Sequence, residues 1–203
     1  MSRLYAFVLS LMLPCAVWAQ DWPAFHAVVD VAQDDVLNVR SAPSGSSEII
    51  GELGPNQTGI EVIRRDESGK WGLVNSGERA GWAFMRYLEP MPGGAFPDHD
   101  RLSCGGTEPF WGLDLASGYS AEFSSPEGTW SVQPTELLKA WGRRTPFAFT
   151  GQSPERLVSA VITPESCNDG MSDREFGLSI TMITETPGDV TVLSGCCALG
   201  VGQ

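Results

Sequence analysis

The stretch Leu37–Pro43 reads LNVRSAP and alternates apolar with polar residues before it ends in a turn-forming Ser-Ala-Pro. Successive side chains of a β-strand point to opposite faces, so a period of two indicates a strand with one buried face. We therefore expect Leu37 and Val39 to point into a core. Asn38 and Arg40 then point outward, where a ligand can reach them.

Short apolar segments continue on both sides of this stretch, and turn residues separate them. The expected strands are Ala27–Val31, Val36–Arg40, Glu48–Leu53, Gly59–Arg65, Trp71–Asn75 and Ala80–Phe84. So many strands in about sixty residues indicate a small closed barrel, because closure hides the edges of a short sheet.

Five motifs follow one another in this region in a fixed order. They are LNVRSAP at 37–43, IIGEL at 49–53, IEVI at 60–63, KWGLV at 70–74 and AGWAFMRYL at 80–88. Their order resembles the bacterial SH3 (SH3b) domain over about residues 27–90. The turn GPNQT at 54–58 departs from the family, which has a polar turn with a Lys-Gly pair there. The resemblance implies an SH3-like barrel that recognises peptidoglycan peptides or a protein partner.

The candidate ligand-binding residues of this barrel combine polar and aromatic side chains. They are Asn38, Arg40, Trp71, Trp82 and Tyr87. An arginine can pair with the carboxylate of a peptide, and aromatic rings can cover its apolar parts. Each tryptophan has a second interpretation, because a ring of this size also fills the core of a small barrel.

The second half of the mature chain differs in its cysteines. Residues 89–97, EPMPGGAFP, interrupt every regular pattern, and we expect a linker at residues 91–100. After it lie the four cysteines that remain once Cys15 is removed with the leader: Cys104, Cys167, Cys196 and Cys197. An even number in an exported protein predicts two disulfides. The neighbours Cys196 and Cys197 bridge each other poorly, which leaves two pairings open.

Three motifs mark this second half. They are GTEPFW at 106–111, CNDGMSDR at 167–174 and GCC at 195–197. They are similar to a family of uncharacterised exported envelope proteins and lipoproteins, over about residues 101–199. The resemblance implies a β-rich domain without a known activity, and its motif residues are Glu108, Phe110, Trp111, Asp169, Ser172, Asp173 and Arg174. The fold class is therefore all-β, an SH3-like barrel followed by a disulfide-stapled antiparallel β domain, with Thr135–Trp141 as the one segment that can form a short helix.

The first 19 residues have the pattern of a secretory signal peptide. Arg3 precedes an apolar run, Leu4–Leu13, that is too short to span a membrane, and Val17–Ala19 forms a cleavage site before Gln20. We expect a periplasmic or secreted protein with no stable membrane insertion after cleavage. Without this segment 12 basic and 25 acidic residues remain, a net charge of about −13. Such a charge excludes nucleic acid as a partner and disfavours anionic lipid.

Enzymatic activity has little support in the sequence. A cysteine peptidase needs a histidine beside its thiolate, and the mature chain offers only His26 and His99. A carboxylate pair for hydrolysis would have to combine Glu108 with Asp169 or Asp173. The oxygen donors between 168 and 175 do not have the spacing of a calcium loop. We expect no metal, no cofactor and no enzyme.

Two function hypotheses follow from this reasoning. The first is a non-enzymatic envelope-binding protein that acts through the SH3-like barrel. The second is an inhibitor of an envelope hydrolase or a stress-protective protein, acting through the C-terminal domain, whose stapled loops would lose little entropy on binding.

Overall fold

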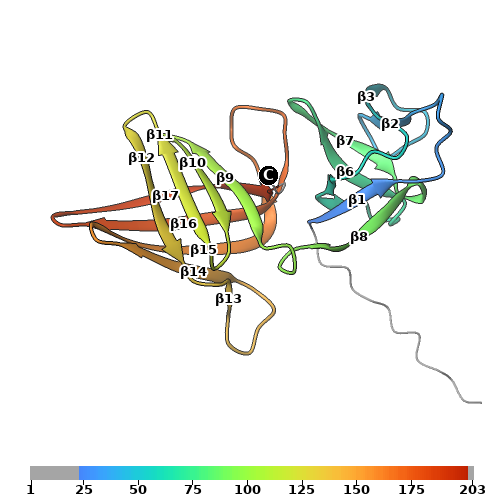
Figure 1. Cartoon of the computed structure of the whole chain (residues 1–203). Coiled ribbons are helices and arrows are strands. Elements are labelled where there is room, and N and C mark those ends of the chain that lie inside the picture. Colours follow the sequence, from blue (N-terminus) through green and yellow to red (C-terminus); the bar gives the residue numbers. More distant parts are fainter. Residues whose placement is uncertain (1–22, 201–203) are drawn as a thin grey trace, which may run out of the picture.

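A computed structural model describes residues 23–200, and it consists almost entirely of antiparallel β-strands (Figure 1). The predicted signal peptide lies outside the described residues. Two barrels follow each other along the chain, which confirms the all-β prediction. No helix within residues 23–200 is both long and apolar enough to cross a membrane.

The first barrel is built from a three-stranded and a five-stranded sheet, in the orders β4-β1-β8 and β3-β2-β7-β6-β5. Its strands are β1 (Ala24–Val28), β2 (Leu37–Arg40), β3 (Ile49–Leu53), β4 (Ile60–Val62), β5 (Arg64–Arg65), β6 (Trp71–Ser76), β7 (Arg79–Phe84) and β8 (Leu88–Ala95). A single 3-10 turn, η1 (Met85–Tyr87), connects β7 to β8. The predicted strands are present, with boundaries that differ by a few residues.

The core of the first barrel is aliphatic. Leu37 and Val39 are buried, as their alternation predicts, and Asn38 and Arg40 stay partly exposed. The core also contains Val28, Leu53, Ile60, Val62, Val74, Ala83, Met85 and Leu88. No aromatic ring belongs to the buried members of this cluster within the described chain. Trp71 and Trp82 are both half-buried at the surface, so neither fills the core.

The second barrel is a meander that closes on itself. The sheet order is β12-β11-β10-β9-β17-β16-β15-β14-β13, and a further pairing of β12 with β14 closes eight of these strands while β13 stays at the edge. The strands are β9 (Arg101–Thr107), β10 (Phe110–Ala116), β11 (Ser120–Ser125), β12 (Gly128–Pro134), β13 (Leu138–Lys139), β14 (Phe147–Ser153), β15 (Arg156–Cys167), β16 (Phe176–Thr186) and β17 (Asp189–Leu199). Eight strands leave an interior that side chains can fill or that holds one small ligand.

The two disulfides lie on the β17 side of the second barrel. Cys104 is bonded to Cys197, directly opposite it on the neighbouring strand, and Cys167 is bonded to Cys196. The prediction of two disulfides from these four cysteines is confirmed. Register decides between the two open pairings, because Cys197 lies opposite Cys104 while Cys196 lies opposite Gly105.

Two sequence-based expectations differ from the structure. The helix expected at Thr135–Trp141 is wrong, because the segment contains β13, which pairs with the start of β14. Leu138 and Trp141 are both exposed, so the apolar residues do not gather on the buried face that a helix needs. The irregular linker expected at 91–100 begins later, because β8 continues to Ala95 and pairs with β1.

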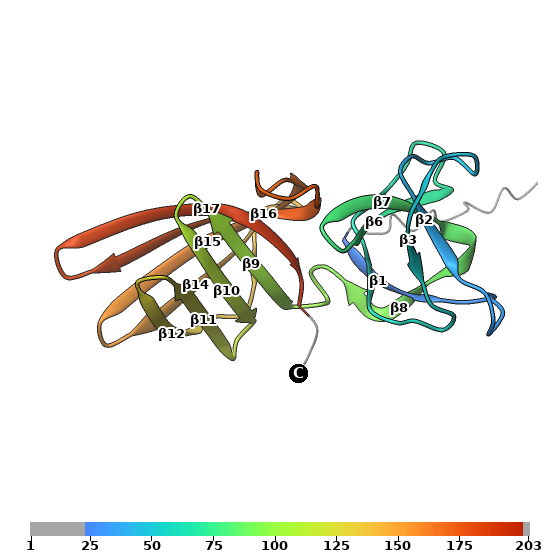
Figure 2. The ribbon, with the colours of Figure 1, turned by 90° about the horizontal axis from the view of Figure 1, so that it is seen from above.

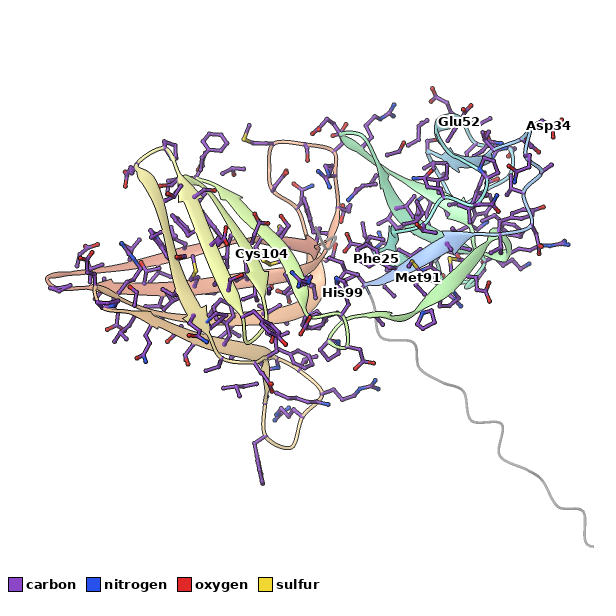
Figure 3. The ribbon with its side chains drawn as sticks, in the orientation of Figure 1. Phe25, Asp34, Glu52, Met91, His99 and Cys104 are labelled. Carbon is purple, nitrogen blue, oxygen red and sulfur yellow. A yellow bond between two sulfur atoms is a disulfide. The ribbon has the colours of Figure 1, made fainter. Side chains whose placement is uncertain are left out.

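Aromatic side chains fix the connection between the barrels. Phe96, just after β8, is fully buried in the core of the second barrel, where its ring centroid lies 4.9 Å from that of Phe147. Phe25 of β1 belongs to the same cluster and makes an edge contact with His99. Figure 3 shows Phe25, Met91 and His99 together where the barrels meet. The short connection is therefore held in place from both sides.

Candidate functional site

A groove on the first barrel brings together most of the residues expected to bind a ligand. Its volume is about 590 Å³. The lining residues come from the segment before β2, from β2 itself and from the aromatic side chains near η1: Asp30, Val31, Ala32, Asp35, Val36, Leu37, Asn38, Arg40, Gly45, Trp71, Phe84 and Tyr87. Four of the five predicted residues line this groove.

One side of the groove is a continuous aromatic surface. Trp71 and Phe84 are cross-strand partners on β6 and β7, with ring centroids 5.1 Å apart. Phe84 lies 6.3 Å from Tyr87, which η1 turns toward the same face. All three rings are half-buried, so each offers part of its surface to a ligand. Phe84 was missed by the sequence analysis, although its alternation with Ala83 places it outward.

The polar side of the groove carries both charge signs. Nη1 of Arg40 donates to the carbonyl oxygen of Ser47 at 2.7 Å, which fixes the arginine against the loop after β2. Asp30 and Asp35 line the same groove, and Oδ1 of Asp35 accepts from the backbone N–H of Val36. Within the described chain no side-chain hydrogen bond of Asn38 is present, so its amide can serve a ligand.

Trp82 does not line the groove. The guanidinium of Arg64 lies over its ring, with Cζ 5.1 Å from the centroid. Although Trp82 is the cross-strand partner of Arg40, its ring is engaged by a residue outside the groove. This tryptophan therefore provides a natural comparison for Trp71.

The motif residues of the second barrel lie in three places: the barrel interior, a surface hollow and the junction with the first barrel. Trp111 is buried inside the barrel, where a Cβ at Gly106 or Gly195 would collide with its ring, which explains those two glycines. Glu108 and Phe110 are exposed at the turn between β9 and β10. Together with Asp169 they line a shallow hollow of about 810 Å³ beside the Cys167–Cys196 bridge.

Asp169 organises the loop between β15 and β16. Its carboxylate accepts from the backbone N–H groups of Met171 and Ser172 and from the hydroxyl of Ser172, each at 2.9 Å. These hydrogen bonds, those from Ser172 foremost, hold the pKa of Asp169 below its ordinary value. A carboxylate that accepts hydrogen bonds from its own loop in this way stabilises the turn.

The end of the same loop docks onto the first barrel. The backbone N–H of Ala80 donates to the carbonyl oxygen of Asp173 at 2.8 Å. Asn75 exchanges two hydrogen bonds with the backbone of Glu175, at 2.8 and 3.1 Å. Figures 1 and 2 both show this loop beside β6 and β7. Asp173 thus lies at the junction, apart from the hollow that contains Glu108 and Asp169.

A buried carboxyl lies at this junction. Oε1 of Glu61 accepts from the backbone N–H of Leu199 at 3.2 Å. Part of the Glu61 side chain still reaches solvent, but burial of its carboxyl between the barrels raises its pKa to about 7, against the opposing influence of Leu199 and the positive Arg174. Nε of Arg174 is itself buried without a hydrogen-bond partner in the described part of the chain.

The described residues contain no metal-binding cluster. Between residues 23 and 200, no three His, Cys, Asp or Glu side chains gather closely enough to hold a metal ion.

The match to known proteins is confined to the first barrel. Residues 35–89 match the family model of the bacterial SH3 domain. This range contains β2 to β7 and most of the groove. No curated protein and no solved structure matches the chain. The comparisons give no support for the expected family resemblance of residues 101–199. The SH3 domain and the two disulfides together indicate an extracytoplasmic protein.

Proposed function

We propose that this protein is an exported, non-enzymatic binding protein of the bacterial cell envelope, and that its SH3 groove recognises the peptides of peptidoglycan. The observation that carries the proposal is the joining of an aromatic surface with Arg40 and Asn38 in one groove of a bacterial SH3 domain. Export rests on the signal-like residues 1–19 and agrees with the disulfides.

The chemistry of the groove fits a short peptide that carries both charges. The guanidinium of Arg40 can pair with a peptide carboxylate, and Asp30 and Asp35 can accept hydrogen bonds from an amino group. The rings of Trp71 and Tyr87 can cover the apolar stems between those groups. A nucleic acid would instead be repelled by a chain with a net charge of −12.

Retention on purified, protease-treated sacculi tests the proposal. We expect the mature protein to be retained, and Trp71→Ala or Arg40→Ala to weaken retention roughly tenfold, about 1.4 kcal/mol per substitution. Trp82→Ala is the matched control, because Trp82 belongs to the same domain but lies outside the groove. Removal of the stem peptides by an amidase should abolish the difference in retention between Trp71→Ala and Trp82→Ala.

Three outcomes would contradict the proposal. Equal retention of all variants would show that the groove is not the binding site. A weaker retention of Trp71→Ala than of Trp82→Ala that survives amidase treatment would assign the groove to the glycan strands. No retention of the wild-type protein would favour a protein partner in the envelope.

A further inference from the structure

The two ends of the second barrel's interior differ, because one is filled by side chains and the other is open. Toward the first barrel its interior is filled by Phe96, Leu102 and other apolar side chains. The other end is a cup of about 550 Å³, within the range of small-molecule sites. The hairpin of β16 and β17 beside this cup extends far from the first barrel (Figure 1). The lining residues that carry the argument are Trp111, Phe123, Trp130, Arg156 and Thr184, with the carboxylates Glu127, Glu155 and Asp189.

A ladder of stacked rings forms one wall of the cup. Trp111 and Phe123 are nearly parallel with centroids 6.0 Å apart, and Phe123 and Trp130 are nearly parallel at 4.5 Å. The guanidinium of Arg156 ends the ladder, with Cζ 4.6 Å from the centroid of Trp130. Such a wall is rigid before any ligand arrives, which reduces the entropy lost on binding.

Two polar groups face the cup without a hydrogen-bond partner in the described chain. Thr184 continues the inward row of Ile180 and Met182 on β16, is only 6% exposed, and its hydroxyl has no hydrogen bond to any residue of the described chain. Arg156 continues the inward row of Val158 on β15, and within residues 23–200 its guanidinium has only the contact with Trp130. Neither group is sealed from solvent, so each opens into the cup and is free to hydrogen-bond a ligand there.

The charges of the lining select the class of ligand. An anion would face the three carboxylates Glu127, Glu155 and Asp189. A cation would meet the guanidinium of Arg156, which already covers the face of Trp130 on which a cation would stack. Hydroxyl groups both donate and accept, so a neutral ligand rich in them can accept from Arg156 and Thr184 and donate to the carboxylates. The carbon skeleton of such a ring can pack against the aromatic wall.

We propose that the mouth of the second barrel binds a neutral, polyhydroxylated ring, that is, an uncharged sugar unit. This site is separate from the SH3 groove. The sugar proposal can therefore be wrong while the groove binds peptidoglycan peptides, and the peptide proposal can be wrong while the cup binds sugar. The groove variants and the cup variants distinguish the two.

Saturation-transfer NMR on the mature protein tests the proposal with three disaccharides that differ in charge. The probes are N,N′-diacetylchitobiose, which is neutral, chitobiose, which carries two ammonium groups, and cellobiouronic acid, which carries a carboxylate. We expect the neutral probe to bind roughly tenfold more tightly than either charged probe. Equal or stronger binding of a charged probe, or no binding of the neutral one, would overturn the proposal.

Substitutions locate the site. Thr184→Val preserves shape and should weaken the neutral probe roughly fivefold through one lost hydrogen bond. Thr181→Val is its matched control, because Thr181 lies on the same strand and points outward. Arg156→Ala should also weaken binding, while Trp71→Ala in the SH3 groove should leave it unchanged. Far-UV circular dichroism checks that both variants are folded. If they are, equal affinities of Thr184→Val and Thr181→Val for the neutral probe would show that the cup is not the sugar site.

Discussion

The two barrels use their aromatic side chains in opposite ways. In the first barrel the core is aliphatic, and Trp71, Phe84 and Tyr87 lie in a surface groove. In the second barrel Phe96 and Trp111 are buried inside, and two disulfides join its strands. A small barrel has too little interior for large rings, which leaves them at its surface. A wider barrel has room for them inside, where Phe96 fills the core and Trp111 also lines the cup.

Removal of the Cys104–Cys197 bridge should have the largest effect, because the bridge spans 93 residues of the second barrel. In the chain-entropy model, the loss of so long a loop costs about 4.6 kcal/mol. We expect Cys104→Ser with Cys197→Ser to destabilise the second barrel by this amount and to leave the first barrel unchanged. Hydrogen exchange, read separately for each barrel, measures both.

The matched control is the pair Cys167→Ser with Cys196→Ser, whose bridge spans only 29 residues. Its loss should cost about 1 kcal/mol less in the same model. An equal loss of protection in both barrels would show that they unfold as one unit, with cores that do not act separately.

Substitutions of two phenylalanines test whether buried rings stabilise the protein more than rings of the groove do. Phe96→Ala should destabilise the second barrel by about 3 kcal/mol, since it empties a fully buried site. Phe84→Ala removes a half-buried ring of the groove and should cost no more than about 1 kcal/mol. Urea unfolding of the two variants gives the values. Similar losses would mean that the groove rings are part of the first core.

The junction between the barrels should respond to pH through Glu61. Its pKa is about 7 in the folded protein, against an ordinary value of 4.5, so the folded state binds the proton more tightly. This contribution to stability is complete below pH 4.5 and is lost as the pH rises through 7. Glu61→Gln should flatten the decline of the free energy of unfolding across that window.

Glu52→Gln provides the control for this measurement, because Glu52 is exposed on β3, far from the junction (Figure 3). Its pH profile should follow that of the wild type. An unchanged slope in Glu61→Gln would mean that the Glu61 carboxyl is not desolvated in solution.

Local patterns predicted the first barrel well. The alternation from Leu37 to Arg40 placed each of its side chains correctly, and the order of motifs agrees with the SH3 match at residues 35–89. Phe84 and Trp82 alternate in the same way along β7, so the pattern alone could not tell which of the two rings lies in the groove.

The second barrel was harder to predict because its decisive contacts are long-range. The pairing of β9 with β17 joins segments far apart in sequence, and its register decides the disulfides. The barrel closes where β12 pairs with β14, past the intervening β13. Asp173 and Arg174 were grouped with Glu108 by motif, yet the fold sends them to the junction. The cup likewise forms only when the second barrel closes, so no short stretch of the sequence indicates it.

We propose that the groove beside Trp71 and Tyr87 binds a peptidoglycan stem peptide. Titration of the ¹⁵N-labelled mature protein with a soluble stem peptide tests it most directly. We expect saturable shifts at Asn38, Trp71 and Tyr87, and unchanged amide resonances in β14 to β17. Shifts confined to the second barrel, or no shifts at millimolar peptide, would contradict it.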